Sequence, residues 1–220
     1  MTTRLSPRAL FFDLDGTLTD PKIGITRCIQ YALEKMGEPV PETDDLVWCI
    51  GPPLQRSFER LAGVARSEQG VRLYRERFAE VGLFENDPYP DIHATLEGLR
   101  GAGADLYVAS SKPLVFVERI LERYELAEFF TRTYGSNLDG THTDKSELLA
   151  HALADSGVDQ HTATMIGDRE HDAVGAANNN MDFVGVLYGY GGRAELEAAG
   201  ASVLVETHAE LTDLLSAPSR

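Results

Sequence analysis

The sequence predicts an α/β protein, in which a parallel sheet is interrupted by an inserted helical segment. Two observations lead to this fold class. Short apolar runs alternate with longer helical patterns, which is the order of elements in a parallel α/β sheet. In addition, the stretch between the first two apolar runs is helical and too long for a single crossover, which favours an insertion.

Five apolar runs are interpreted as the strands of this sheet. They are Ala9–Phe12, Leu106–Ala109, Arg132–Tyr134, Thr164–Ile166 and Phe183–Leu187. Between the second and third runs, the apolar residues of Pro113–Leu126 fall at helical spacing. Pro113 suits the first turn of that helix, because a proline's missing N–H has no partner to lose there.

The insertion is expected to span residues 19–87, which leaves residues 1–18 and 88–220 as the core. Ile25, Ile29 and Leu33 recur at helical spacing. The sequences Gly-Glu-Pro and Gly-Pro-Pro interrupt this helical pattern and indicate turns within the segment. The alternative is a set of extra helices packed on the edge of the sheet.

Composition narrows the class of protein. The formal net charge of -15 argues against a nucleic-acid polymer as partner, but leaves a small phosphorylated substrate open. The two cysteines, Cys28 and Cys49, form neither a zinc cluster nor a disulfide framework, so free thiols in a cytoplasmic protein are expected. The run Ala9–Phe12 is too short for a signal peptide, and no stretch approaches the roughly 18 apolar residues of a membrane helix. No obligatory protein partner is evident.

The first strand runs directly into Asp13-Leu14-Asp15-Gly16-Thr17, at the position where open α/β sheets bind ligands. An aspartate side chain is ordinarily ionised at neutral pH and needs no base to activate it, so Asp13 suits a nucleophile. Asp15 suits a general acid and base, provided that its surroundings raise its pKa. Gly16 would permit a tight turn that brings backbone N–H groups to a phosphate. A solvated Asp-Gly turn is the less favoured alternative.

Two later segments offer groups for a phosphate. Ser110 and Ser111 follow the second strand, and a hydroxyl there could hydrogen-bond a phosphate oxygen, although Ser-x-x-Pro taken alone favours a helix N-cap. Asp144 and Glu147 have capping-box spacing. Lys145 between them opposes the helix dipole, and the chain has only four lysines against sixteen arginines. Contact with a carboxylate and a phosphate would explain this lysine; a solvated surface position is the alternative.

The fourth strand leads into Gly-Asp-Arg-Glu-His-Asp, where Asp168 lies at the strand end and Asp172 four residues later. Mg²⁺ is held by few carboxylates, with water and substrate phosphate completing its octahedron. Asp13, the backbone carbonyl of Asp15 and Asp168 are the predicted ligands. His171 is interpreted as a local hydrogen-bonding residue, because no second histidine lies at ligand spacing.

For three further features a structural interpretation is favoured. Asn178-Asn179-Asn180 is interpreted as a helix end, and Tyr188–Gly192 as a mobile loop beside the site without an assigned role. Arg56 in the insertion is a candidate contact for the leaving group, but a solvated helix position is the favoured interpretation.

The sequence resembles the haloacid dehalogenase superfamily over nearly the whole chain. The resemblance is carried by four segments in this order, which are residues 13–17, 110–113, 144–147 and 167–172. The resemblance implies a Rossmann-like core with a helical cap inserted after the first motif. The roles that it implies are nucleophile for Asp13, acid and base for Asp15, phosphoryl contacts for Ser110 and Lys145, metal ligand for Asp168 and a supporting position for Asp172.

The presence of a second aspartate, Asp15, makes the sequence resemble the phosphatase and phosphomutase branch of this superfamily, because its dehalogenases lack this residue. Segments 50–54, 109–113 and 185–191 resemble a 5′-nucleotidase-like group that is similar to phosphoglycolate phosphatases. The resemblance therefore implies a Mg²⁺-dependent phosphatase that forms an aspartyl phosphate and acts on a nucleoside monophosphate or on phosphoglycolate. A sugar phosphomutase would share every core motif. A phosphopeptide-binding or protein-binding module would not require all the motif residues to be intact.

Overall fold

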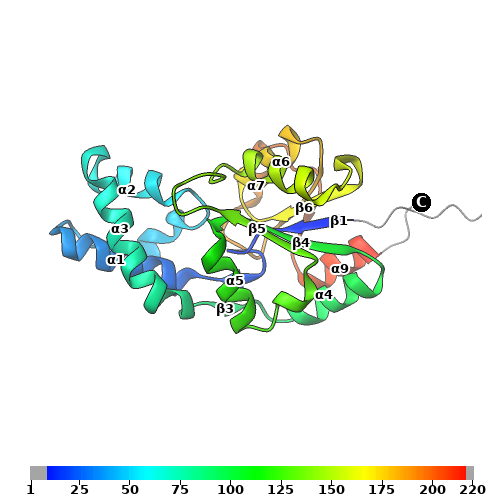
Figure 1. Cartoon of the computed structure of the whole chain (residues 1–220), viewed down its shortest axis with the longest axis horizontal. Coiled ribbons are helices and arrows are strands. Elements are labelled where there is room, and N and C mark those ends of the chain that lie inside the picture. Colours follow the sequence, from blue (N-terminus) through cyan, green and yellow to red (C-terminus); the bar gives the residue numbers. More distant parts are fainter. Residues whose placement is uncertain (1–8, 217–220) are drawn as a thin grey trace, which may run out of the picture. The chain divides into compact units, whose positions relative to one another are not determined.

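The structure is a computed structural model that describes residues 9–216. It divides into two compact units, whose elements are labelled in Figure 1. One unit comprises the residues up to Leu18 together with those from Tyr89 onward, and the other is Thr19–Pro88.

The first unit contains a six-stranded parallel sheet with the strand order β5-β4-β1-β6-β7-β8. Its strands are β1 (Ala9–Phe12), β4 (Asp105–Pro113), β5 (Arg132–Ser136), β6 (Ala163–Gly167), β7 (Asp182–Val186) and β8 (Leu204–Val205). The predicted α/β fold class is confirmed, and all five predicted runs are strands. The prediction misses β8, because two residues are too few to produce a pattern.

Helices cover both faces of this sheet (Figure 1). On one face lie α6 (Lys145–Ser156) and α7 (Glu170–Asn178), with α8 (Arg193–Ala198) beside α7. On the other lie α4 (Ile92–Gly101), α5 (Leu114–Arg123) and α9 (His208–Ser216). Short 3₁₀ helices occupy Ala127–Phe129 and Gln160–Thr162.

The central strand β1 is buried along its whole length. Successive side chains of a strand point to opposite faces, so a strand covered on both faces is a continuous apolar run. Phe11 stacks on Tyr107 with ring centroids 4.7 Å apart, in the core cluster that includes residues of α6. Phe12 makes an edge contact with Phe130 at 6.2 Å. This packing explains why the first predicted strand is found with the predicted bounds.

The junction between β4 and α5 differs from the prediction. β4 continues to Pro113, and α5 begins at Leu114, so Pro113 precedes the helix instead of occupying its first turn. No side chain caps the helix at Pro113. The N-cap interpretation of the Ser-x-x-Pro pattern is therefore wrong, because the serines still belong to an extended strand.

The second unit, Thr19–Pro88, is helical apart from one short strand pair. Its helices are α1 (Lys22–Met36), α2 (Leu54–Ala62) and α3 (Val64–Glu80), with 3₁₀ helices at Asp44–Cys49 and Gly82–Phe84. β2 (Thr19–Asp20) and β3 (Asp87–Pro88) pair antiparallel at its two ends and form a sheet separate from the six-stranded one. This pairing brings the two chain connections of the unit side by side.

Close packing in the second unit depends on two helical glycines. A Cβ at Gly24 in α1 would lie 2.2 Å from the carbonyl oxygen of Gly82, and one at Gly70 in α3 would lie 2.3 Å from the ring of Phe58. Only glycine permits these approaches of backbone to its neighbours.

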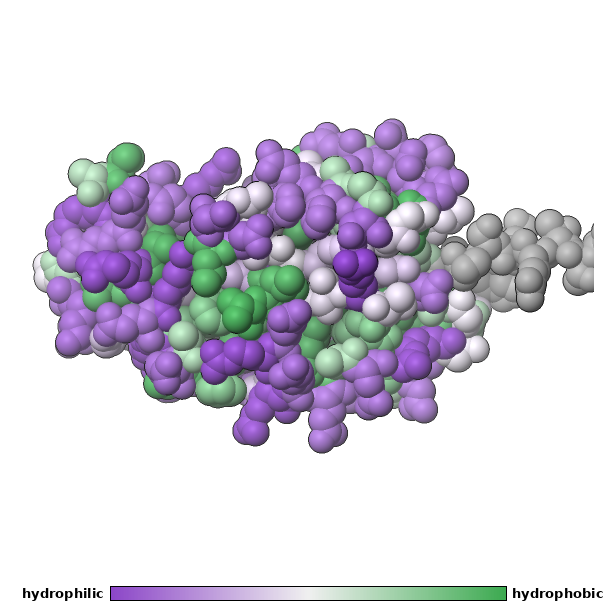
Figure 2. Space-filling model, in the orientation of Figure 1, coloured by the Kyte–Doolittle hydropathy of each residue, from purple (hydrophilic) through white to green (hydrophobic). Residues whose placement is uncertain are grey.

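Within residues 9–216, no helix is both long enough and apolar enough to cross a membrane. Figure 2 shows hydrophilic residues over most of the face that it presents, with apolar residues in smaller groups between them. This distribution agrees with the large negative formal charge of -15.

Candidate active site

The predicted site residues of the first and fourth segments follow neighbouring strands. β1 pairs with β6 in parallel register, with Phe12 opposite Ile166, and the N–H of Asp13 donates to the carbonyl oxygen of Ile166 at 2.9 Å. Asp13 and Asp168 thus both lie just past the carboxyl ends of adjacent strands. The carboxyl edge of an open α/β sheet is its usual ligand-binding edge.

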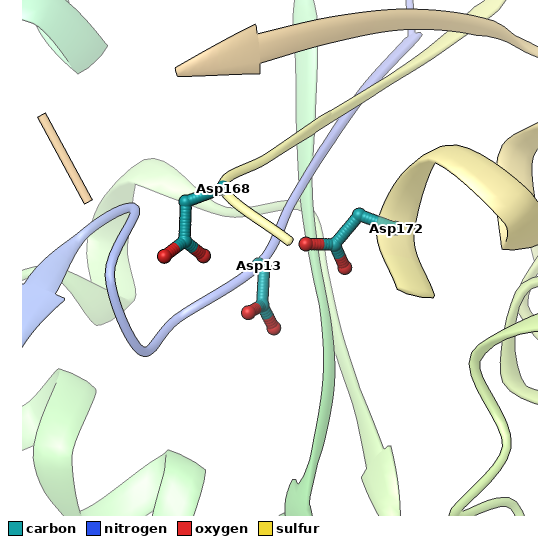
Figure 3. A group of neighbouring side chains, drawn as sticks. All are labelled: Asp13, Asp168 and Asp172. Carbon is teal, nitrogen blue, oxygen red and sulfur yellow. The ribbon is translucent and has the colours of Figure 1, made fainter. Parts of the chain in front are cut away.

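Three carboxylates meet at this edge, from Asp13, Asp168 and Asp172 (Figure 3). One oxygen from each lies within 4.8 Å of the other two, and all three residues are buried. Burial, together with the charges of Asp172 and Asp13, raises the pKa of Asp168 well above its usual value. Three buried carboxylates repel one another, so the group is suited to a cation.

Lys145 places one positive charge in this group. Its Nζ donates to Asp13 Oδ1 at 2.9 Å, to Asp172 Oδ1 at 2.7 Å and to the carbonyl oxygen of Ala109 at 2.8 Å. Burial alone would lower the pKa of Lys145, but Asp13 and Asp172 raise it above its ordinary value, so the ammonium remains charged. The solvated-surface alternative for Lys145 is wrong, because the residue is buried.

The start of α6 explains how a lysine can occupy a first helical turn. Asp144 precedes the helix, and its Oδ1 accepts the N–H groups of Ser146 at 2.9 Å and Glu147 at 3.2 Å. This carboxylate satisfies the free N–H groups of the first turn. The contacts of Lys145 with Asp13 and Asp172 outweigh its unfavourable position in the helix dipole.

The two oxygens of Asp168 have different surroundings. Oδ2 accepts the N–H of Tyr190 at 2.7 Å, whereas Oδ1 is buried and has no hydrogen-bond partner among the described residues. In Asp172, by contrast, Oδ1 binds Lys145 and Oδ2 accepts the N–H of Arg169 at 3.2 Å. An unpartnered buried carboxylate oxygen is costly unless a ligand completes it, so Oδ1 of Asp168 fits a metal ligand.

Gly16 is required by this arrangement. Its φ is +87°, and a Cβ there would lie 2.2 Å from Asp168 Oδ2. A larger residue would displace the carboxylate of Asp168. Glycine is therefore required at position 16 for steric reasons, in addition to the tight turn that the sequence predicts there.

Asp15 lies outside the cluster of three carboxylates but is also buried. Its Oδ1 accepts from Lys112 Nζ at 2.7 Å. Burial raises the pKa of Asp15 above its ordinary value, although Lys112 acts in the opposite direction. A carboxyl with a raised pKa is the type of group that general acid-base catalysis needs.

Lys112 is a site residue that the sequence interpretation missed. It stands in the same Ser-Ser-Lys-Pro segment as the two predicted serines, but only those serines were predicted to bind phosphate. The scarcity of lysine, which singled out Lys145, also applies to Lys112 and was a usable signal.

Ser110 and Ser111 lie near the carboxyl end of β4. Ser110 is buried, and its Oγ accepts a long hydrogen bond from the N–H of Lys112 at 3.4 Å. The carbonyl oxygen of Ser111 accepts the hydroxyl of Ser136 at 2.9 Å. β4 pairs with β1 in parallel, so both serines lie at the same edge of the sheet as Asp13.

Two of the remaining predictions concern a helix end and a loop near the site. α7 ends at Asn178, as the Asn-Asn-Asn sequence predicts, and the side-chain amide of Asn179 donates to the carbonyl oxygens of Ser146 and Gly175. The segment Tyr188–Gly192 lies beside the site, as predicted, and packs against Asp168.

Comparison with known proteins gives a consistent result. A family model described as haloacid dehalogenase-like hydrolase matches residues 10–186. A 5′-nucleotidase of Pseudomonas aeruginosa is 46% identical over 191 residues, which is 86% of each chain. A crystal structure of a predicted phosphatase from Clostridium acetobutylicum superposes with a TM-score of 0.92 and 39% identity, over 95% of this chain and 98% of that one.

Other relatives carry different names. The tyrosine-protein kinase PtkA of Mycobacterium tuberculosis is 36% identical over 96% of this chain and 72% of its own length. A phosphoglycolate phosphatase of Caulobacter vibrioides is 30% identical over 92% of this chain and 88% of its own.

Proposed function

Because the chain belongs to the haloacid dehalogenase-like hydrolase family, we propose that it is a Mg²⁺-dependent phosphatase that forms an aspartyl phosphate on Asp13. The observation that carries the proposal is the contact of the buried Asp13 carboxylate with the Lys145 ammonium at 2.9 Å, beside Asp168 and Asp172. A nucleophile, a fixed positive charge and further carboxylates for a cation are the parts that phosphoryl transfer needs.

Each side chain has a chemical role in this proposal. Lys145 holds Oδ1 of Asp13, so the other oxygen of that carboxylate attacks phosphorus in line. Lys145 also stabilises the negative charge of the transferring phosphoryl group, together with the hydroxyls of Ser110 and Ser111 and the N–H groups of the turn at Gly16. Asp15 donates a proton to the leaving oxygen and then removes one from the water that hydrolyses the aspartyl phosphate.

The proposed ligands of Mg²⁺ are Asp13, the backbone carbonyl of Asp15 and Asp168. The unpartnered Oδ1 of Asp168 supports this set of ligands. Both carboxylate oxygens of Asp172 already have protein partners, which supports a different role for Asp172, namely to hold Lys145 in position. When bound, Mg²⁺ would neutralise negative charge on the phosphoryl oxygens and on the carboxylates around it.

The proposed substrates are small phosphomonoesters, with 5′-nucleotides ahead of phosphoglycolate. The 46% identity to a 5′-nucleotidase supports this order, compared with 30% to a phosphoglycolate phosphatase. In this proposal Thr19–Pro88 is the cap of the family and excludes bulk water during the reaction. The proposed location of the enzyme is the cytoplasm.

Phosphate release from a panel of substrates tests the function. The panel comprises nucleoside 5′-monophosphates, phosphoglycolate and sugar phosphates, and product analysis separates inorganic phosphate from an isomerised sugar phosphate. Incubation with ATP and a tyrosine-containing protein tests the kinase activity named for one relative. A catalytic efficiency for phosphoglycolate far above that for every nucleotide would reverse the proposed substrate order, and a stable isomerised product would indicate a mutase.

Removal of metal should abolish the activity. We expect hydrolysis of p-nitrophenyl phosphate to stop in excess chelator and to return on addition of Mg²⁺, because Asp13 and Asp168 otherwise repel both each other and the substrate phosphate. The measurement is nitrophenol release against added Mg²⁺ after chelation. Full activity in excess chelator would contradict the metal assignment.

Replacing Lys145 by Ala should reduce kcat by about 10²- to 10³-fold, because the transition state loses a preorganised positive charge. Lys145→Arg should be impaired less, since it keeps the charge but presents a planar fork in place of a compact ammonium. Lys35→Ala is the matched control, because Lys35 is exposed in α1. Steady-state kinetics below the unfolding temperature of each variant measure the effect, and unchanged kinetics for Lys145→Ala would remove this residue from the proposed machinery.

A further inference from the structure

The glycine-rich segment Tyr188–Gly192 packs its backbone directly against Asp168. A Cβ at Gly189 would lie 2.4 Å from the Cβ of Asp168, and one at Gly191 would lie 1.7 Å from the carbonyl oxygen of Asp168. Neither position has room for a side chain. The glycines therefore allow the N–H of Tyr190 to reach Asp168 Oδ2 at 2.7 Å.

This hydrogen bond makes the two oxygens of Asp168 unequal. Oδ2 is occupied by the N–H of Tyr190, while Oδ1 is buried without a partner among the described residues. A carboxylate that is held through one oxygen has a defined direction for the other. Hydrogen bonds behind a ligand orient it and tune its affinity for metal in this way.

Tyr188 anchors the segment at its beginning. Its hydroxyl donates to the carbonyl oxygen of Thr17 at 3.3 Å, and Thr17 lies in the turn that also contains Asp15 and Gly16. The ring of Tyr188 stacks on His208, the first residue of α9, with centroids 4.1 Å apart. Tyr89 adds an edge contact at 5.2 Å. The segment is thus tied both to the turn after β1 and to a helix of the core.

We propose that Tyr188–Gly191 is a positioning element for the metal site. The N–H of Tyr190 orients Asp168 so that Oδ1 is the metal ligand, and Tyr188 and Gly191 are positioning residues that hold this N–H in place. The inference rests on the proposed function, in which Asp168 is a metal ligand.

Binding of Mn²⁺ alone, measured on the full chain by electron paramagnetic resonance without substrate, tests the proposal. Gly191→Ala should weaken Mn²⁺ binding by about 10- to 100-fold, since a methyl group cannot fit beside the carbonyl of Asp168. Gly192→Ala is the matched control. It lies in the same segment, has φ -84° and ψ 159°, and its Cβ would have no neighbour within 4 Å, so Mn²⁺ binding should be unchanged.

Tyr188 provides a second pair of variants in case Gly191→Ala does not fold. Tyr188→Leu loses the hydroxyl and the stack on His208, and Mn²⁺ binding should weaken about 10-fold. Tyr188→Phe keeps the stack and loses one long hydrogen bond, so binding should recover to within about 3-fold of the unaltered chain. A general loss of structure would lower thermal stability without this recovery pattern.

Asp168→Asn separates the inference from the proposed function. If Asp168→Asn loses Mn²⁺ binding while folded Gly191→Ala and Tyr188→Leu both stay within about 2-fold of the unaltered chain, the positioning role is overturned and the metal site stands. If Gly191→Ala is unfolded, Tyr188→Leu decides alone by the same criterion. If Asp168→Asn binds Mn²⁺ as the unaltered chain does, the metal assignment fails and the inference fails with it.

Discussion

Replacing Asp13 by Asn should reduce phosphate release by about 10⁴-fold or more on every substrate, since an amide is a poor nucleophile and carries no negative charge. The loss should be the same for aryl and alkyl phosphates, because no aspartyl phosphate forms with either. Rapid acid quench with labelled substrate should trap phosphorylated protein for the unaltered chain and none for Asp13→Asn.

Asp182→Asn is the control for this substitution. Asp182 is exposed on β7, so the change alters the same functional group away from the site and should leave the kinetics unchanged. Retention of more than a few per cent of activity by Asp13→Asn would mean that another group attacks phosphorus. A phosphorylated protein trapped from that variant would locate the group.

Asp15→Asn should affect the two chemical steps differently. The substitution keeps a side-chain oxygen for Lys112, which lies 2.7 Å from Asp15 Oδ1, and it keeps the backbone carbonyl proposed to hold Mg²⁺. What it removes is the transferable proton, which is typically worth about 10²- to 10⁴-fold in each step that uses it. Nitrophenol leaves without much protonation, so phosphorylation of Asp13 should partly survive with p-nitrophenyl phosphate.

Hydrolysis of the aspartyl phosphate then becomes limiting in this variant, because the attacking water has lost its base. Stopped-flow measurements should show a burst of nitrophenol close to the enzyme concentration, followed by slow turnover. An alkyl phosphate should show no burst, because its leaving oxygen needs the missing proton. Near-normal steady-state rates on both substrates would remove Asp15 from acid-base catalysis.

The strand prediction succeeded because the central strands are buried on both faces. Continuous burial imposes an apolar run that ends abruptly, and β1 ends directly before Asp13. The sequence thereby predicted which residues would follow the strands and meet at one edge of the sheet. The prediction was less accurate at the end of β4, where polar residues up to Pro113 remain in the strand. Pairing with β5 continues there with an irregular register, and such pairing leaves no hydrophobic pattern.

The amino-acid sequence by itself determined the fold class, the family resemblance and the residues expected at the site, since each depends on local pattern or on motif order. Only the tertiary structure decided which of these residues touch. It showed that Lys145 binds both Asp13 and Asp172, that Lys112 pairs with Asp15, and that the N–H of Tyr190 holds one oxygen of Asp168. These partners lie 22 to 132 residues apart in the chain, and Lys145 meets Asp172 because α6 and α7 pack together. Contacts of this kind depend on strand order and side-chain direction. Every residue except proline has a backbone N–H, so the sequence does not show which N–H binds a given carboxylate.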